Sequence, residues 1–97
     1  NTARVIPAGL TARYDRETWA LPAEMKFLSN VAAVPQADME RTWNAGIGMV
    51  AIVDPTAADL TIASLAARGM KAWVAGRVDS TPGTRGSAAL AGTYKSR

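Results

Sequence analysis

The sequence contains neither cysteine nor histidine. The absence of cysteine excludes disulfides, thiolate chemistry and cysteine-ligated metal sites within the chain. Without histidine, a metal site would depend on carboxylates, and no cluster of Asp and Glu occurs at ligand spacing. A serine or cysteine nucleophile activated by histidine is excluded for the same reason.

A long hydrophobic run and a basic stripe are also missing. The longest apolar run, 47–53, contains a glycine and is far shorter than the ~20 residues that span a bilayer. Residues 1–79 hold eight basic and eight acidic side chains, so the net charge of +3 comes from Arg85, Lys95 and Arg97. Dispersed charges of this kind are typical of a solvated surface. We therefore expect neither a membrane nor a nucleic acid as a partner.

The most informative stretch runs from Arg41 to Val50. It joins the end of a predicted helix to an apolar segment through a turn that contains Asn44, Gly46 and Gly48. One interpretation is a helix C-cap and tight turn, because asparagine and glycine adopt left-handed backbone easily. The other is a backbone floor for an anionic or polar ligand. The spacing alone does not separate the two.

The first half of the chain shows one strand pattern and two helix patterns. Alternation of apolar and polar side chains predicts a half-buried strand over 10–14. A helix is expected to begin at Pro22. A second helix is expected to begin at Pro35, to bury Met39 and Trp43, and to end in the Asn44 turn. The first helix carries an apolar stripe that we expect in the core: Met25, Phe27, Leu28, Val31 and Ala32.

The second half adds further elements. The apolar segment 49–53 predicts a strand covered on both faces. Thr56 and Asp59 resemble a capping box that opens a helix ending at Gly69. Its inner stripe is expected to comprise Ala58, Ile62, Leu65 and Ala66. A strand over 71–79, a loop from 81 to 87, an edge strand within 88–94 and a frayed end at 95–97 follow. The predicted fold class is α+β, with helices packed on one face of a mixed or antiparallel sheet.

Several motifs, in this order, resemble the C-terminal part of aminoimidazole ribonucleotide synthetase, also called phosphoribosylformylglycinamidine cyclo-ligase. The family typically carries Asn-x-Pro-Arg-Val-x-Pro, Trp-x-x-Pro, Glu-Met-x-Arg-Thr-Phe-Asn-x-Gly-x-Gly-Met and Ala-Trp-x-x-Gly. Order and spacing agree over about the first 80 residues, with Ala3 in place of proline and Trp43 in place of phenylalanine. The matching residues are Asn1, Arg4, Val5, Pro7, Trp19, Pro22, Met39, Arg41, Thr42, Asn44, Gly46, Gly48, Met49, Ala72, Trp73 and Gly76.

The resemblance implies that the sequence covers less than a third of the enzyme. Residues 1–79 would form the second half of its C-terminal domain, and 80–97 would add a loop, a possible edge strand and the tail. It also implies a cytoplasmic enzyme, a homodimer when intact, whose ATP and magnesium are bound mainly by the remaining part. The 97 residues alone are expected to be inactive.

The implied reaction is the ATP-dependent ring closure of formylglycinamidine ribonucleotide to aminoimidazole ribonucleotide in purine synthesis. ATP would activate the amide oxygen as a phosphate, and a nitrogen of the same substrate would close the ring. We expect Asn1, Arg4, Asn44, Gly46 and Gly48 to form part of the substrate-binding side of the cleft. Arg4 would pair with a phosphate, the asparagine amides would orient polar groups, and the glycines would admit close approach.

Two alternatives stay open. The chain could come from a relative with the same fold, such as formylglycinamide ribonucleotide amidotransferase or selenophosphate synthetase. It could instead be a free-standing α+β binding module, although its start within a motif argues against this.

Overall fold

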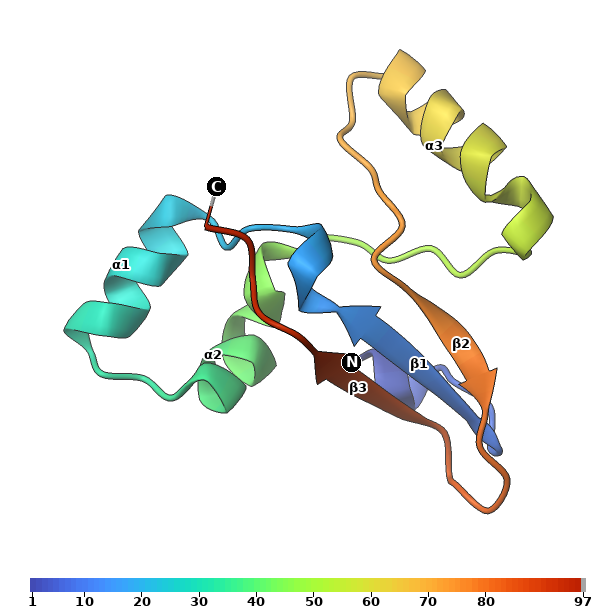
Figure 1. Ribbon diagram of the computed structural model, residues 1–97, viewed down its shortest axis with the longest axis horizontal. Coiled ribbons are helices and arrows are strands. Elements are labelled where there is room, and N and C mark those ends of the chain that lie inside the picture. Colours follow the sequence, from blue (N-terminus) through green and yellow to red (C-terminus); the bar gives the residue numbers. More distant parts are fainter. Residues whose placement is uncertain (97) are drawn as a thin grey trace.

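The computed structural model describes residues 1–96. Three helices, three strands and four 3-10 turns follow one another along this part of the chain (Figure 1). In order, they are η1 (Thr2–Arg4), β1 (Leu10–Asp15), η2 (Arg16–Thr18), α1 (Ala23–Val31), α2 (Gln36–Trp43), η3 (Asn44–Gly46), η4 (Pro55–Ala57), α3 (Ala58–Ala67), β2 (Gly76–Ser80) and β3 (Ser87–Ala91).

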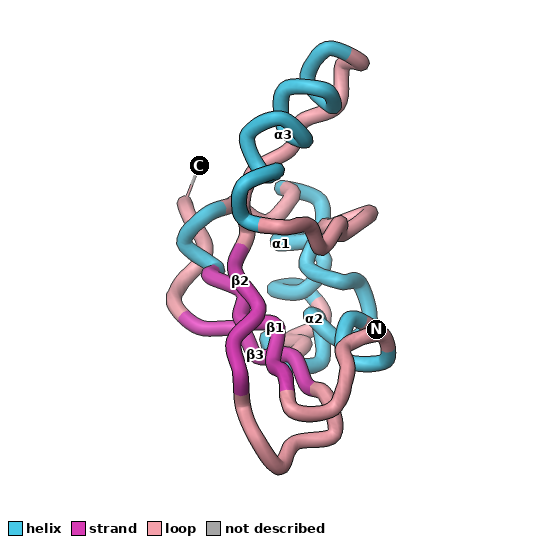
Figure 2. Tube along the Cα trace, turned by 90° about the vertical axis from the view of Figure 1, so that its right-hand side faces the viewer, coloured by secondary structure: helices cyan, strands magenta, loops and turns pink. Residues whose placement is uncertain are grey.

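The strands form one mixed sheet in the order β2-β1-β3. The central strand β1 runs antiparallel to β2, with Leu10 opposite Ser80 and Tyr14 opposite Gly76. It runs parallel to β3, which returns to the sheet through the loop after β2. A mixed three-stranded sheet with three helices confirms the predicted α+β class. The helix α3, however, extends away from the sheet rather than packing on it (Figures 1 and 2).

The buried core is small and lies where β1, α2 and the turn after α2 meet. Its apolar members are Ile6, Ala12, Trp19, Met39 and Ala45. Met39 is almost fully enclosed, with 2% of its surface exposed, as predicted, whereas Trp43, also predicted to be buried, is only half-buried. Because so few side chains are enclosed, the apolar contribution to folding comes from a narrow region around Trp19 and Met39.

One polar side chain of β1 is buried, in contrast to the simple alternation expected for 10–14. The Thr11 hydroxyl forms hydrogen bonds with the hydroxyls of Thr81 and Ser87, both at 2.7 Å. Thr11 is 5% exposed because the two neighbouring strand ends close over it. Hydroxyls can be buried in this way when each has a partner, and here the partners lie 70 and 76 residues away.

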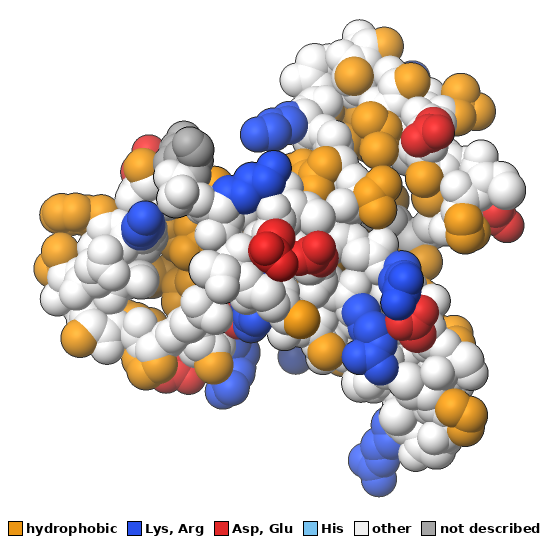
Figure 3. Space-filling view, in the orientation of Figure 1, with side chains coloured by type: hydrophobic (Ala, Val, Ile, Leu, Met, Phe, Trp, Pro, Cys, Tyr) orange, Lys and Arg blue, Asp and Glu red, His pale blue; other side chains and the backbone are white. Residues whose placement is uncertain are grey.

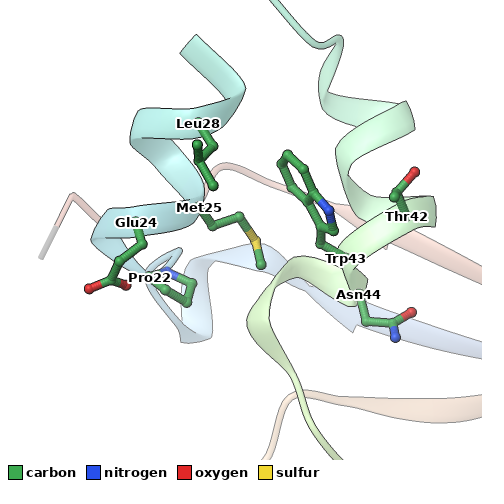
Figure 4. A pocket seen from close by; sticks show the side chains of 7 residues that line it. All are labelled: Pro22, Glu24, Met25, Leu28, Thr42, Trp43 and Asn44. Atoms are coloured by element: carbon green, nitrogen blue, oxygen red, sulfur yellow. The ribbon is translucent and has the colours of Figure 1, made fainter. Parts of the chain in front are cut away.

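The apolar stripe of α1 does not lie in the core, so that prediction was wrong for this chain. Phe27, Leu28 and Val31 are all more than half exposed, and none of the α1 side chains is buried. The helix itself forms as expected, with Pro22 at its N-cap. Periodicity therefore identified the helix correctly, but α2 lies opposite only part of its apolar side and Phe27 and Val31 stay exposed (Figure 4).

The segment 49–53 is not a strand, because it lies apart from the sheet and pairs with no described strand. The predicted strand over 71–79 is shorter than expected and begins at Gly76. The cap before α3 is also different from the predicted capping box. Asp54 accepts hydrogen bonds from the Thr56 backbone N–H and hydroxyl, at 2.9 and 2.7 Å. None of the α3 side chains is buried, so its expected inner stripe remains accessible.

The end of the chain lies against the connection after β1. The backbone N–H of Lys95 donates to the carbonyl of Trp19 at 3.0 Å, next to an isolated bridge between Ala20 and Lys95. Of the predicted frayed residues 95–97, Arg97 lies outside the described part. None of the described helices is both long and apolar enough to cross a membrane.

Candidate functional site

A hollow of about 630 Å³ lies between the N-terminal turn, the sheet and the segment that follows α2. It brings together three of the predicted site residues, namely Asn1, Asn44 and Gly48. Arg4 and Gly46 are not among its lining residues. The lining comprises Asn1, Thr2, Ala3, Val5, Tyr14, Trp19, Ala37, Glu40, Arg41, Asn44, Ala45, Ile47, Gly48, Met49, Val50, Ile52, Ala88 and Leu90.

The turn at one side of this hollow has left-handed backbone at three successive residues. The φ angles are 52° at Asn44, 53° at Ala45 and 83° at Gly46. Asparagine and glycine adopt this region readily, whereas an alanine costs about 1 kcal/mol or more there. The Trp19 indole N–H holds the turn by donating to the Ala45 carbonyl at 3.1 Å, in a buried position. A strained residue that is fixed by its surroundings is typical of functional turns.

The structure requires glycine at one of the two glycine positions of this turn but not at the other. At Gly46 a side chain would meet the Pro22 ring, with the added Cβ 2.5 Å from Cδ. Close packing and positive φ therefore account for Gly46 without any ligand. At Gly48 an added Cβ would meet nothing within 4 Å, and the backbone has no positive φ. Gly48 faces the hollow without a structural requirement of its own.

The N-terminal turn η1 supplies Asn1 and Arg4. The Arg4 backbone N–H donates to the Asn1 carbonyl at 3.1 Å, which closes the turn. The Thr2 hydroxyl shares a hydrogen bond of 2.6 Å with the Tyr14 hydroxyl and so ties η1 to β1. Both Asn1 and Arg4 have exposed side chains. Among residues 1–96, Arg4 takes part in none of the ion pairs.

Arg41 is the cation that lines the hollow, and it was not among the expected site residues. It occupies the last turn of α2 and has an exposed side chain. The signal in the sequence was its place beside Thr42 in the same motif as Asn44. With the amides of Asn1 and Asn44, its guanidinium could bind a polar or anionic group, because amides both donate and accept while arginine donates in a fixed fork.

A second group that sequence reasoning missed lies behind the same wall. The guanidinium of Arg16 binds the Glu40 carboxylate through two hydrogen bonds, Nε to Oε2 at 2.7 Å and Nη2 to Oε1 at 2.9 Å. The Tyr94 hydroxyl donates to the same carboxylate. The Arg16 side chain also lies over the Tyr94 ring, 5.8 Å from its centre. These residues come from three distant segments, so no spacing in the sequence indicates the cluster.

The cluster keeps its charges at neutral pH. Hydrogen bonds from the Arg16 guanidinium hold the pKa of the Glu40 carboxyl below its usual value. The same contacts raise the pKa of Arg16. Burial, reinforced by the hydrogen bond to Glu40, raises the pKa of Tyr94 to about 12. Glu40 therefore stays ionised and Tyr94 stays a neutral donor, which fixes the α2 turn that carries Arg41 and Asn44.

Replacing Arg16 by methionine is expected to lower the free energy of unfolding by about 2 kcal/mol at pH 7, because it leaves a mostly buried carboxylate without its cation. Glu40 has a lowered pKa in the folded chain, so the pair stabilises above the ordinary value of 4.5. That contribution is lost as the pH falls through the lower folded value. Urea unfolding of wild type and variant between pH 3 and pH 7 measures both effects.

The control for this prediction is Arg13→Met. The ion pair between Arg13 and Asp79 has a similar distance of 3.0 Å, but its side chains are 50% and 33% exposed. Exposed pairs contribute about 0–1 kcal/mol. Equal losses in the two variants, or an Arg16→Met deficit that does not shrink at low pH, would contradict the interpretation.

A second hollow, of about 530 Å³, lies between α1 and α2 (Figure 4). The Met25 side chain and the Trp43 ring point toward one another across it, while Thr42 and Asn44 point away from α1. Asn44 lines both hollows. The left-handed turn therefore lies between the two hollows, one on the α1 side and one on the side of the N-terminal turn.

No group of three or more Asp and Glu side chains among residues 1–96 lies close enough to hold a metal ion. The first hollow instead offers two amides, one carboxylate and one guanidinium at its wall. Such a set can bind and orient a polar molecule, and it contains no nucleophile paired with a general base.

The family model described as "AIR synthase related protein, C-terminal domain" matches residues 1–88. The chain belongs to this family. The match includes η1, the left-handed turn and the beginning of β3, so the first hollow lies almost entirely within the family domain. The predicted resemblance to the C-terminal part of aminoimidazole ribonucleotide synthetase is thereby confirmed.

Three relatives illustrate the similarity of this AIR synthase-related chain. A "Putative phosphoribosylformylglycinamidine cyclo-ligase" of Streptomyces fradiae is 42% identical over 78 residues, which cover 80% of this chain and 43% of the relative. Cyclo-ligases of Burkholderia lata and Sorangium cellulosum are 43% and 44% identical over 81 and 80 residues, covering 84% and 82% of this chain. The latter two matches each cover 23% of the relative, so the chain spans less than half the length of any of the three proteins.

Proposed function

We propose that this chain forms part of a phosphoribosylformylglycinamidine cyclo-ligase and contributes to the substrate-binding side of its cleft. The whole enzyme would convert formylglycinamidine ribonucleotide to aminoimidazole ribonucleotide with consumption of ATP. The observation that carries the proposal is the hollow that joins Asn1, Asn44 and Gly48, residues of two family motifs, in a chain 42–44% identical to proteins of that name.

Each wall residue has a role in this proposal. The amides of Asn1 and Asn44 orient polar groups of the substrate, and Gly48 admits close approach of the substrate to the backbone. Arg41, which lines the hollow, is a second candidate for the phosphate beside Arg4. Gly46 acts through the turn by allowing Pro22 to pack closely. The chain thus contributes positioning, a major part of catalysis in reactions of this class.

ATP and magnesium are assigned to no residue of this chain. Among residues 1–96, no three or more Asp and Glu side chains lie close enough together to hold a metal ion. We propose that the remaining part of the enzyme binds both. A homodimer of the intact enzyme, a cytoplasmic location and inactivity of the 97 residues alone belong to the same proposal.

The proposal is tested in a chimera in which this chain replaces the matched region of the Burkholderia lata cyclo-ligase. Asn44→Gly is the decisive variant, because glycine retains the left-handed turn but removes the amide. We expect kcat/KM for formylglycinamidine ribonucleotide to fall about 10- to 100-fold, as for the loss of a hydrogen bond to a polar or charged group. Full activity of this variant in an active chimera would refute the assignment of Asn44.

Gly48→Ala provides an independent check of close approach. Its added methyl group meets no atom of the chain, so the free energy of unfolding should change by less than about 0.5 kcal/mol. If a substrate approaches the backbone here, KM should nevertheless rise about tenfold. An unchanged KM would restrict Gly48 to shaping the segment after α2.

A further inference from the structure

The tail that follows β3 lies beyond the family match, yet it contacts the wall of the first hollow from behind. The family match ends within β3, and the described tail comprises residues 92–96. The backbone N–H of Lys95 donates to the Trp19 carbonyl at 3.0 Å, and Arg16 Nη1 donates to the Gly92 carbonyl at 3.4 Å. Figure 1 shows the tail running from β3 past α2 toward α1. The wall therefore rests on a segment that the family model does not include.

Tyr94 supplies the side chain that binds the tail to this wall. Its ring packs edge-on against the Trp19 ring, with 5.4 Å between the centres. The Arg16 guanidinium lies over the same ring, and the Tyr94 hydroxyl donates to the Glu40 carboxylate. Trp19 and Glu40 both line the first hollow, whereas Tyr94 does not. Tyr94 thus joins two residues of the wall without lining the hollow itself.

General apolar packing does not account for the position of the tail. In the space-filling view of the face that the tail crosses, hydrophobic side chains gather over α1 and α3, and the middle of the face carries acidic side chains (Figure 3). The other tail residues, 92, 93, 95 and 96, are exposed. The tail is held instead by the hydrogen bonds above and by the Tyr94 ring. Hydrogen bonds to a carboxylate are short and directional, so they fix the geometry of the groups that they join.

The two wall residues that Tyr94 contacts hold the backbone on either side of the Asn44 side chain. The Glu40 carbonyl accepts a hydrogen bond from the Asn44 N–H at the end of α2. The Trp19 indole donates to the carbonyl of Ala45, the next residue. Left-handed backbone at residues other than glycine, as at Asn44 and Ala45, persists only where the surrounding structure holds it. A change at Tyr94 would therefore reach Asn44 through two separate contacts.

The contacts of Tyr94 belong to this chain and not to the motifs that it shares with the family. Glu40 occupies the unspecified position between Met39 and Arg41 in the motif Glu-Met-x-Arg. Arg16 precedes the Trp-x-x-Pro motif, and Tyr94 lies outside the matched residues. The support of the turn by the tail is therefore read from the structure of this chain and does not follow from its family.

We propose that Tyr94 is a positioning residue for the substrate-binding wall. It fixes the left-handed turn through Glu40 and Trp19, and so holds the Asn44 amide at the hollow without touching the substrate. The inference rests on the proposed function, from which it takes the substrate. The hydroxyl is the decisive group, because Tyr94→Phe keeps the ring against Trp19 and removes only the hydrogen bond to Glu40. Arg16 stays on the carboxylate in this variant, so the fold should be retained.

Hydrogen exchange of the 97-residue chain tests the first step, the support of the turn. The amides of Asn44 and Ile47 both donate hydrogen bonds at this turn. In Tyr94→Phe, both amides should exchange about tenfold faster, because the turn opens more easily, while the amides of β1 keep their rates and report the intact fold. Tyr14→Phe is the matched control, since the Tyr14 hydroxyl binds Thr2 and not α2. Unchanged exchange in Tyr94→Phe, or equal acceleration in both variants, would overturn the proposal.

Kinetics of the Burkholderia lata chimera, which includes the tail, test the second step, the placement of the Asn44 amide. Tyr94→Phe should raise KM for formylglycinamidine ribonucleotide about five- to tenfold and change kcat by less than about twofold, because the amide contributes to binding. Lys95→Ala is the control within the tail. It retains the backbone hydrogen bond to Trp19 and should leave both constants unchanged.

A double-mutant cycle shows whether Tyr94 acts through Asn44. In the Asn44→Gly background, Tyr94→Phe should change KM by less than about twofold, since the amide that Tyr94 positions is absent. A residue that only stabilises the fold would have the same effect in both backgrounds. Equal effects of Tyr94→Phe with and without the Asn44 amide would therefore overturn the proposal.

Failure of this proposal and failure of the proposed function give different results. An inactive chimera would contradict the proposed function, and exchange of the Asn44 amide in the 97-residue chain would still decide whether Tyr94 fixes the turn. An active chimera whose KM is unaffected by Tyr94→Phe would overturn the positioning role and leave the proposed function in place.

Discussion

Replacing Gly76 by alanine is expected to disrupt the pairing of β2 with β1. Gly76 lies opposite Tyr14 in the sheet, and an added Cβ would be 1.8 Å from the Arg13 carbonyl oxygen. This neighbour is backbone in the central strand, so it cannot move aside as a flexible side chain would. We expect the free energy of unfolding to fall by about 3 kcal/mol or more, at or beyond the upper end for overpacking.

Thermal unfolding followed by tryptophan fluorescence measures this effect, and the midpoint should fall by more than about 12 °C. Gly83→Ala is the matched control. Gly83 has a φ of +87°, but an added Cβ there meets nothing within 4 Å. In the control, the free energy of unfolding should therefore fall only by the cost of left-handed backbone at an alanine, about 1–2 kcal/mol. If Gly76→Ala were no more destabilising than Gly83→Ala, the close approach of β1 and β2 at this position would be wrong.

Local signals predicted the local structure of this chain well. Alternation identified β1, and the helical spacing of apolar residues identified α1 and α2. The turn after α2 was identified because Asn44 and Gly46 are residues that adopt positive φ at low cost. These features depend on the chemistry of neighbouring residues, which the sequence contains in full.

Burial was predicted less well, because it depends on what lies opposite an element. Phe27 on α1 and Ile52 in the segment 48–53 have patterns typical of buried residues, yet both are exposed. The spacing of apolar residues indicates which side chains are suited to burial, but it does not indicate which part of the molecule packs against them.

The candidate site was predicted only in part, because the fold decides which side chains come together there. Motif positions identified Asn1, Asn44 and Gly48, which the fold brings to one hollow. The fold places Arg41 rather than Arg4 in the lining. The ion pair between Arg16 and Glu40 joins residues 24 positions apart on different elements, and only tertiary structure brings them together.

Replacing Trp19 by alanine should have an effect of similar size, because four segments of the chain meet at this residue. Its backbone carbonyl accepts from Lys95, its indole N–H donates to Ala45, and its ring lies 6.2 Å from Trp73 and 5.4 Å from Tyr94, between centres. Truncation would leave a cavity in a small core, so the free energy of unfolding should fall by about 3–5 kcal/mol.

Trp19→Phe separates the indole hydrogen bond from the apolar volume. Phenylalanine retains most of the ring contacts but leaves the buried Ala45 carbonyl without its donor, which should cost about 1–3 kcal/mol. Because that carbonyl anchors the left-handed turn, the amides of 44–46 should also exchange faster than those of β1. Trp73→Phe is the control, since its indole donates to the Thr18 hydroxyl at 3.2 Å and not to the turn. If both variants loosened the turn equally, Trp19 would stabilise the fold without positioning Asn44 at the hollow.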